Sequence, residues 1–76
     1  MSETSSRVYW LSSVSPRCEV TGEPITDVFV DGRVKHPGQW AIMSVSAHTR
    51  YGCGLGRGRG QRYRLQADGR WLKEEG

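Results

Sequence analysis

The sequence predicts a small β-rich α+β domain with two β-hairpins and one short helix. Its 76 residues are enough for one domain. Runs of aromatic and β-branched residues are separated by Gly, Pro and Asp, which is typical of strands joined by turns. Only one segment carries the signals of a helix start. Because both chain ends are polar and would bury little, we expect a disordered tail over 1–6, one domain over 7–73 and a mobile tail over 74–76.

The N-terminal part of the domain predicts a strand followed by a turn. Residues 7–14 bring Val, Tyr, Trp and Leu close together, a composition that favours an extended chain. Pro16 ends this strand because proline has no N–H to donate to a sheet. Residues 18–24 then contain Thr-Gly-Glu-Pro, which is typical of a turn.

The next segment predicts a tight hairpin. Residues 25–30 are mainly apolar and β-branched and favour a strand. Asp-Gly at 31–32 favours a two-residue turn, because both central residues of that turn take positive φ. A returning strand over 33–35 would place Phe29 opposite Val34, an apolar cross-strand pair.

A strand and the single helix follow. Residues 40–43, Trp-Ala-Ile-Met, predict a short strand. Residues 44–51 predict a brief helix, since the Ser44 hydroxyl can cap its free N–H groups. Gly52 stands where helices often end in a left-handed residue.

The C-terminal part predicts a closing hairpin and completes the core. Residues 61–66 and 70–73 form its strands, and Ala-Asp-Gly at 67–69 forms its turn. Large aromatic side chains can bury much area in a small domain. We expect the core to be built on Trp10, Trp40, Tyr63 and Trp71.

Glycine and arginine dominate the stretch 50–64. From Gly54 to Gly60 every second residue is glycine, which lets a backbone approach a partner closely. Either these glycines cradle a phosphate, or they let the chain wrap around a tryptophan, with Trp40 the best candidate. The run lacks the Lys-Ser/Thr of a nucleotide-binding P-loop, so nucleotide hydrolysis is not expected.

The positive charge is concentrated in the C-terminal third. Residues 50–76 carry seven basic side chains against three acidic ones, whereas residues 1–49 carry four against five. Arginine forks suit phosphate groups, and nearby tyrosines can stack on bases. We therefore expect a contact with nucleic acid of weak sequence specificity, or with a protein, through Arg50, Arg57, Arg59, Arg62, Arg64 and Arg70.

Several other classes of function are not expected. No apolar run reaches the length of about 18 residues that a membrane span needs, so we expect no membrane contact. Two cysteines without a signal peptide indicate reduced thiols and a cytoplasmic protein. Ser44, Ser46 and His48 lie close in sequence, but no carboxylate stands beside them to orient the histidine, so we expect no enzyme.

The chain also resembles a family. The segments that carry the resemblance are Phe29-Val-Asp-Gly, Pro37-Gly-Gln-Trp-Ala-Ile-Met43, Tyr51-Gly52 after His48, Gly54-Leu-Gly-Arg-Gly-Arg-Gly-Gln-Arg-Tyr63 and Asp68-Gly-Arg-Trp71. In this order they are similar to small uncharacterised proteins encoded by bacteriophages and prophages, over about residues 18–76. The resemblance implies an accessory protein that acts in the cytoplasm of a bacterial host.

Many members of that family look like a small zinc ribbon with two cysteine pairs. Of these ligands the chain keeps at most Cys18 and His48, the latter beside the second pair, whereas Thr21, Ser44 and Ala47 stand where the other cysteines would be. The resemblance therefore implies a zinc-ribbon-like fold without most of its metal ligands. The scattered set Cys18, His36, His48 and Cys53 is an alternative metal site, but its spacing matches no ligand-pair motif. We expect neither a metal nor another cofactor.

Three hypotheses of function follow. The first is a bacteriophage-type accessory protein whose Gly/Arg-rich loop binds a polyanion, above all nucleic acid. The second is a protein–protein inhibitor of a host enzyme or defence complex. The third is a structural accessory of a virion or a larger assembly.

Overall fold

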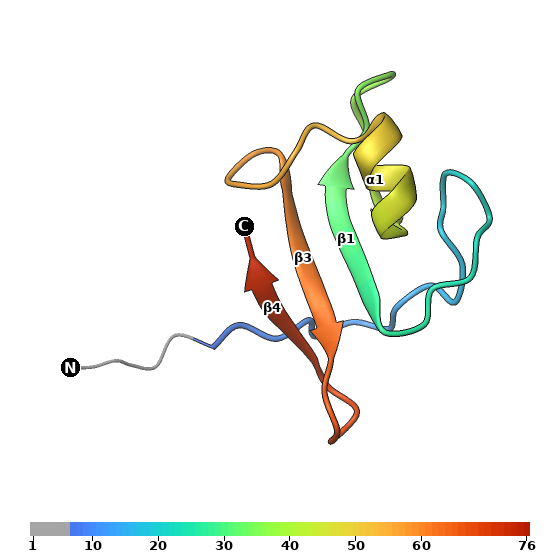
Figure 1. Ribbon diagram of the computed structural model, residues 1–76. Coiled ribbons are helices and arrows are strands. Elements are labelled where there is room, and N and C mark those ends of the chain that lie inside the picture. Colours follow the sequence, from blue (N-terminus) through green and yellow to red (C-terminus); the bar gives the residue numbers. More distant parts are fainter. Residues whose placement is uncertain (1–6) are drawn as a thin grey trace.

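A four-stranded antiparallel sheet runs through the protein, and one helix packs on one of its faces (Figure 1). This computed structural model describes residues 7–76, so the expected tail over 1–6 lies outside the described residues. The prediction of a small, mainly β domain with one short helix is confirmed. The strands lie in the order β2-β1-β3-β4. The elements are β1 (Val28–Arg33), β2 (Trp40–Met43), α1 (Val45–Tyr51), β3 (Gly60–Leu65) and β4 (Trp71–Glu75).

The expected hairpin around Asp31 and Gly32 is wrong. Both residues lie inside β1, which pairs with β2 on one side and with β3 on the other. Gly32 does not form a turn; it lies where neighbouring groups pack closely against the strand. A Cβ on Gly32 would lie 3.2 Å from Met43 Cε and 3.3 Å from the Arg59 carbonyl oxygen. The site therefore needs glycine because neighbouring groups approach the strand closely.

The strand partners of this segment differ accordingly. Phe29 lies opposite Tyr63 of β3, not opposite Val34. Val34 follows the end of β1 and forms an isolated bridge with Gly52. The first hairpin in the sequence is therefore β1–β2, closed by the longer connection 34–39.

The predicted first strand over 7–14 is also wrong. The segment lies along the outer edge of β4, where Tyr9 and Leu72 form an isolated bridge. Two further backbone hydrogen bonds join residues 8–10 to residues 71–73, and the chain then bends at Ser12. Pairing ends at Trp10 because its partner, Trp71, is the first residue of β4.

An aromatic cluster covers one face of the sheet. Phe29 is fully buried at its centre. Its ring centroid lies 5.3 Å from that of Trp10, 5.1 Å from that of Tyr63 and 5.0 Å from that of Trp71. Trp40 does not join this cluster, although we expected it in the core: it is 47% exposed.

The opposite face is covered by α1 and by the segment around Cys18. Cys18, Met43 and Ala47 form a buried cluster, and Val34 and Ala41 pack against it. The predicted helix is confirmed, and the Ser44 hydroxyl accepts a hydrogen bond from Ala47 N at 3.2 Å. The prediction that the helix ends in a left-handed residue at Gly52 is wrong.

Gly52 ends α1 for a different reason. Its φ is −86°, which is an extended conformation. A Cβ at this position would clash with His48 Cδ2 and lie 2.7 Å from the His48 carbonyl oxygen, so there is no room for a side chain. Glycine is required here because His48 of the same helix lies against the residue that ends the helix.

The closing hairpin is confirmed, and its second strand is longer than predicted. β3 and β4 pair around a turn in which Gly69 has a φ of +88°. β4 continues to Glu75, so two of the three residues expected in the 74–76 tail are part of the sheet. The register shifts between Arg62 and Tyr63, which pair with Glu75 and Lys73, so the extra residue of this bulge is Glu74 in β4.

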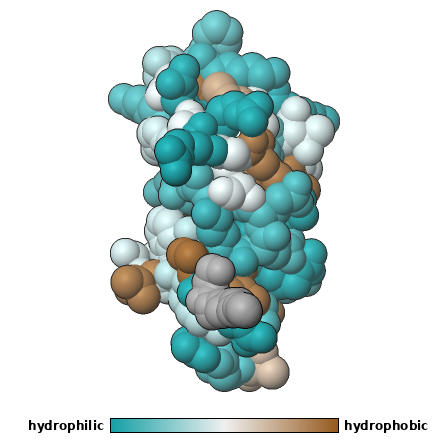
Figure 2. Space-filling view, turned by 90° about the vertical axis from the view of Figure 1, so that its left-hand side faces the viewer, coloured by the Kyte–Doolittle hydropathy of each residue, from teal (hydrophilic) through white to brown (hydrophobic). Residues whose placement is uncertain are grey.

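The side of the molecule on which β4 lies is largely hydrophilic (Figure 2). Hydrophobic residues appear there in small separate places and form no continuous surface. Within residues 7–76, no helix is long and apolar enough to cross a membrane.

Candidate nucleic-acid interface

The six arginines expected to bind a partner lie in three different environments. Those of the closing hairpin, Arg62, Arg64 and Arg70, form ion pairs within the chain. Arg50 lies on α1 beside a hollow that also contains Glu23. Arg57 and Arg59 lie in the loop between α1 and β3. The structure therefore does not gather the six into one basic surface.

The ion pairs of β3 and β4 form a connected network. Arg62 Nε lies 2.6 Å from Glu74 Oε2, and its Nη2 lies 2.7 Å from Glu75 Oε1. Arg64 Nε lies 2.8 Å from Glu74 Oε1. Hydrogen bonds from Arg64 and Arg62 hold the pKa of Glu74 below its ordinary value, although partial burial opposes them.

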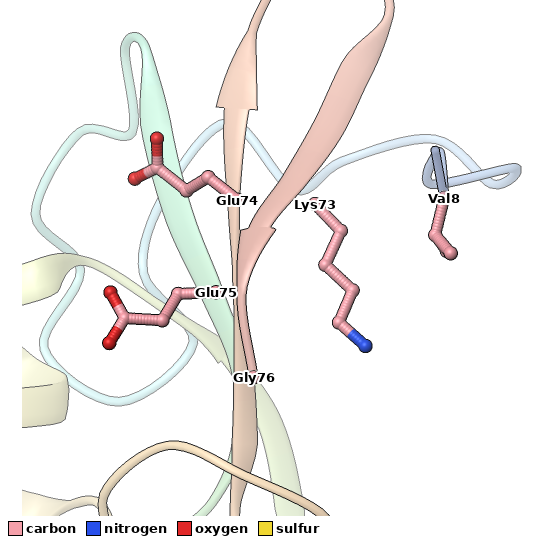
Figure 3. A pocket seen from close by; sticks show the side chains of 5 residues that line it. All are labelled: Val8, Lys73, Glu74, Glu75 and Gly76. Carbon is pink, nitrogen blue, oxygen red and sulfur yellow. The ribbon is translucent and has the colours of Figure 1, made fainter. Parts of the chain in front are cut away.

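Both carboxylates of this network lie on the same side of β4 (Figure 3). Successive side chains of a regular strand point to opposite faces, so this placement fits the bulge at Glu74, the residue of β4 that has no partner in β3. Lys73 and Val8 lie on the other side of the strand. The five residues of Figure 3 line an open hollow of about 240 Å³, which offers no buried group for chemistry.

Arg70 is held by two contacts. Its Nε lies 2.9 Å from Asp68 Oδ2, and its guanidinium lies over the Tyr9 ring at 4.1 Å from the centroid. Together these contacts tie the turn of the closing hairpin to the N-terminal segment. The positive charge of Arg70 thus already interacts with Asp68 and with the Tyr9 ring.

Arg50 faces a cluster that holds the start of α1. Glu23 Oε1 accepts hydrogen bonds from the hydroxyls of Thr21, Ser44 and Ser46 at 3.2, 2.8 and 2.7 Å. Hydrogen bonds from Ser46, Ser44 and Thr21, helped by the charge of Arg50, lower the pKa of Glu23. The surrounding hollow is about 180 Å³. We interpret this cluster as a cap for the helix.

The two remaining arginines lie in a loop that glycines shape. Gly54, Gly56 and Gly58 have φ values of +86°, +125° and +76°. Gly56 and Gly60 exchange backbone hydrogen bonds of 2.7 and 3.0 Å, which close the loop on itself. A Cβ on Gly56 would lie 2.8 Å from Arg59 Nη2, so the guanidinium rests against bare backbone. The expectation that these glycines wrap around Trp40 is wrong, because their close contacts are with the loop itself, Arg59 and the end of β1.

Backbone hydrogen bonds fix this loop to the end of β1. Arg33 N donates to Arg59 O at 2.9 Å, and Cys53 N donates to Arg33 O at 3.1 Å. Two residues further on, Lys35 N donates to Tyr51 O at 2.7 Å. The loop and the end of β1 accordingly lie at one end of the molecule, at the top of Figure 1.

Sequence reasoning missed the residues that β1 brings to this end. Arg33 pairs directly with Trp40 of β2, and both side chains are exposed. The signal was present in the alternation Arg33-Val34-Lys35, where the central residue packs against the core and its neighbours are exposed. It was overlooked because this segment lies in the half of the chain that is acidic overall.

We call Arg33, Lys35, Arg57, Arg59 and Trp40 the basic end. Among residues 7–76, no carboxylate oxygen lies within 4.0 Å of these four cations. The nearest acid along β1 is Asp31, whose pKa is raised by burial and by the charge of Glu19. The basic end is thus a small area of unpaired positive charge with one exposed aromatic ring.

The cysteines and histidines do not converge on a metal site. Within the part of the chain that the structure describes, no group of three or more His, Cys, Asp or Glu side chains is placed to hold a metal ion. Cys18 is buried, and Cys53 is half-buried in the loop. His48 Nε2 lies 2.8 Å from the carbonyl oxygen of Gly54, away from the Ser44 and Ser46 hydroxyls bound to Glu23.

Cys18 does occupy a polar setting inside the core. Burial raises the pKa of its thiol, but hydrogen bonds from Thr21 and from the backbone around Ser44 outweigh that effect and lower the pKa to about 7. Thr21 N donates to its sulfur at 3.4 Å, and Ala47 packs in the same cluster. The three positions at which the zinc-ribbon resemblance expects further ligands, Thr21, Ser44 and Ala47, therefore lie around Cys18 and are filled by residues that pack or donate hydrogen bonds.

Comparisons with models of protein families, with curated proteins and with solved structures found no match for this chain. Zinc-ribbon membership and a bacteriophage origin therefore stay predictions. Function is inferred below from the geometry of the basic end.

Proposed function

We propose that this chain binds nucleic acid through the basic end, by contacts to phosphate that tolerate many sequences. One observation carries the proposal. Arg33 and Lys35 lie on β1 and its exit, and Arg57 and Arg59 lie in the loop that follows α1. Backbone hydrogen bonds join these two segments, and among residues 7–76 no carboxylate oxygen lies within 4.0 Å of any of the four cations.

The loop supports phosphate binding by its shape. An arginine fork can donate two parallel hydrogen bonds to a phosphate, and these bonds are stronger than those between neutral groups. Gly58 lies at the tip of the loop between the two arginines, and a Cβ there would meet nothing within 4 Å. The backbone beside Arg57 is therefore open, so that a phosphate chain can approach it closely.

The closing hairpin is a weaker candidate for this role. Arg62 and Arg64 already share the carboxylates of Glu74 and Glu75. A phosphate would have to replace these carboxylates, so the binding of nucleic acid at β3 and β4 would gain little net energy. We accordingly narrow the proposed site from six arginines to the basic end.

The test compares two double variants that remove the same charge. Binding of a fluorescein-labelled oligonucleotide to the 76-residue chain is measured by anisotropy at about 50 and 200 mM salt. Arg57→Ala/Arg59→Ala should weaken binding and reduce the salt slope by about 1.4 for a single strand, because two phosphate contacts are lost. Arg62→Ala/Arg64→Ala lowers the net charge equally and should have a much smaller effect.

Two results would contradict the proposal. One is the absence of oligonucleotide binding at the lower salt concentration, which would leave the protein-inhibitor hypothesis in its place. The other is equal loss of affinity in both double variants, which would mean that net charge alone attracts the polyanion. Heparin as a competitor provides the control for a polyanion that has no bases.

A further inference from the structure

We infer that the basic end selects unpaired bases, with Trp40 as the surface on which a base stacks, so that the preferred ligand is a single strand and not a duplex. This inference rests on the proposed function and adds the class of nucleic acid to it. Its central observation is that an exposed tryptophan lies directly opposite an exposed, unpaired arginine.

The position of Trp40 is fixed by the sheet. Trp40 and Arg33 are Cα partners in the β1–β2 ladder, and directly opposite residues of an antiparallel pair share one face. The neighbouring Ala41 packs against the cluster under α1 on the other face. Since side chains alternate along a strand, the indole and the guanidinium project on the same side.

The exposure of this ring is not required by the core. Trp10 and Trp71 both contact Phe29 and are only half-exposed, whereas Trp40 is 47% exposed and outside that aromatic cluster. Trp40 is therefore an exposed aromatic ring at the basic end that does not take part in the aromatic core.

An added β-strand is a poorer explanation of the exposed ring. Ile42 is an edge residue of β2 whose backbone faces outward, and both of its polar groups are occupied. Ile42 N donates to Glu19 Oε1 at 2.7 Å, and Glu19 N donates to Ile42 O at 2.9 Å. The chain itself covers the edge at this residue, so a partner strand cannot pair with Ile42 without displacing Glu19.

The chemistry then distinguishes single strands from duplexes. Base faces are hidden inside a duplex, whereas an unpaired base can lie against an indole ring, and every base has such a face. The neighbouring cations would bind the phosphates on either side of that base. A duplex presents only its phosphates to the basic end, because its base faces are hidden. Discrimination should therefore come from Trp40, and the salt dependence from the arginines and Lys35.

The test uses oligonucleotides of about 12 nucleotides, within the range that small single-strand-binding domains cover. The wild-type chain should bind the single strand about tenfold more tightly than the duplex of the same sequence. Trp40→Ala should remove about that factor for the single strand, change duplex binding by less than about twofold and leave the salt slope unaltered. Trp40→Phe keeps a ring and should keep most of the preference.

Tryptophan fluorescence provides a second readout. The single strand should quench the emission of the wild-type chain, and Trp40→Phe should remove the quenching, since Trp10 and Trp71 pack in the aromatic cluster. Thermal unfolding of each variant confirms that an exposed site has been changed without loss of the fold.

The inference and the function on which it rests fail in different ways. Equal affinity for duplex and single strand, an unaffected Trp40→Ala variant, or quenching that persists in Trp40→Phe would each overturn the stacking role while phosphate binding still stands. Absence of binding to either oligonucleotide, or no effect of Arg57→Ala/Arg59→Ala, would overturn the proposed function itself.

Discussion

Single residues decide which interactions this small sheet can make. An added Cβ would clash with His48 at Gly52, and it would crowd Met43 at Gly32 and the Arg59 guanidinium at Gly56. Phe29 is the complementary case, a large side chain that three other aromatic rings surround. In a chain of this size, one such buried ring contributes a large share of the free energy of unfolding.

Phe29→Ala should destabilise the fold by about 3–5 kcal/mol, because it removes a fully buried ring and leaves a cavity between Trp10, Tyr63 and Trp71. Urea unfolding followed by tryptophan fluorescence measures this change. Leu11→Ala is the control, since Leu11 is 95% exposed and should change the free energy of unfolding by less than about 0.5 kcal/mol. Similar effects of the two changes would show that the aromatic cluster is not the core.

At the scale of elements, the loop 53–59 and the closing hairpin have opposite electrostatic characters. The loop holds arginines with glycine and no acids, and backbone hydrogen bonds join it to β1. The hairpin holds arginines that β4 neutralises. Two basic segments that are adjacent in sequence are therefore very different in their capacity to bind an anion.

Gly56→Ala should weaken both the fold and oligonucleotide binding. Its φ of +125° strains an L-residue, and the new methyl group would displace the Arg59 guanidinium. Gly58→Ala is the matched control, because Gly58 also has a positive φ, +76°, but open space around it. We expect both variants to lose about 1–2 kcal/mol of stability by urea unfolding, and Gly56→Ala alone to lose affinity further. Equal affinities of the two variants would show that the position of Arg59 does not matter.

At the scale of the whole molecule, the pairing of charges determines where the net charge of +3 is available. Glu74 and Glu75 neutralise β3, Asp68 neutralises Arg70, and Glu23 faces Arg50. Among residues 7–76, eight basic side chains have no carboxylate oxygen within 4.0 Å. Half of them, Arg33, Lys35, Arg57 and Arg59, belong to the basic end, whereas the others lie on separate segments: Arg7, Arg17, Arg50 and Lys73. We therefore expect a partner that carries negative charge to favour the basic end.

Glu74→Gln should make the stability of the fold less sensitive to acid. The folded pKa of this carboxyl is depressed, so its contribution is fully present above the ordinary value of about 4.3 and is lost as the pH falls through the lower folded value. Urea unfolding at neutral pH and at points below about pH 4.3 measures the loss. The variant should lose less stability than the wild type over this interval.

The same variant also tests the balance of charge. Freed from Glu74, Arg64 should become available to a polyanion, so oligonucleotide affinity at low salt should rise. Glu75→Gln is the comparison, since Glu75 pairs with Arg62 alone and is more exposed. An acid dependence that stays the same in Glu74→Gln would show that the network contributes nothing to stability, as is common for exposed ion pairs.

The sequence alone determined the features that depend on neighbouring residues. The Ser44 cap, the strand Trp40–Met43 and the closing hairpin around Gly69 were predicted because each signal acts within a few residues. The high local concentration of arginine was equally evident. These features needed no knowledge of how distant segments meet.

Only the tertiary structure decided the pairing of strands and the state of the charges. Asp31-Gly32 had the residues of a turn, but both residues pair with β2 on one side and β3 on the other and so lie inside β1. Arg62 and Arg57 look alike in sequence, yet a carboxylate 12 residues away neutralises the first. Trp40 had the composition of a core residue, and the register of β2 turned it outward beside Arg33. Each outcome depends on contacts between segments far apart in the chain, which local signals do not contain.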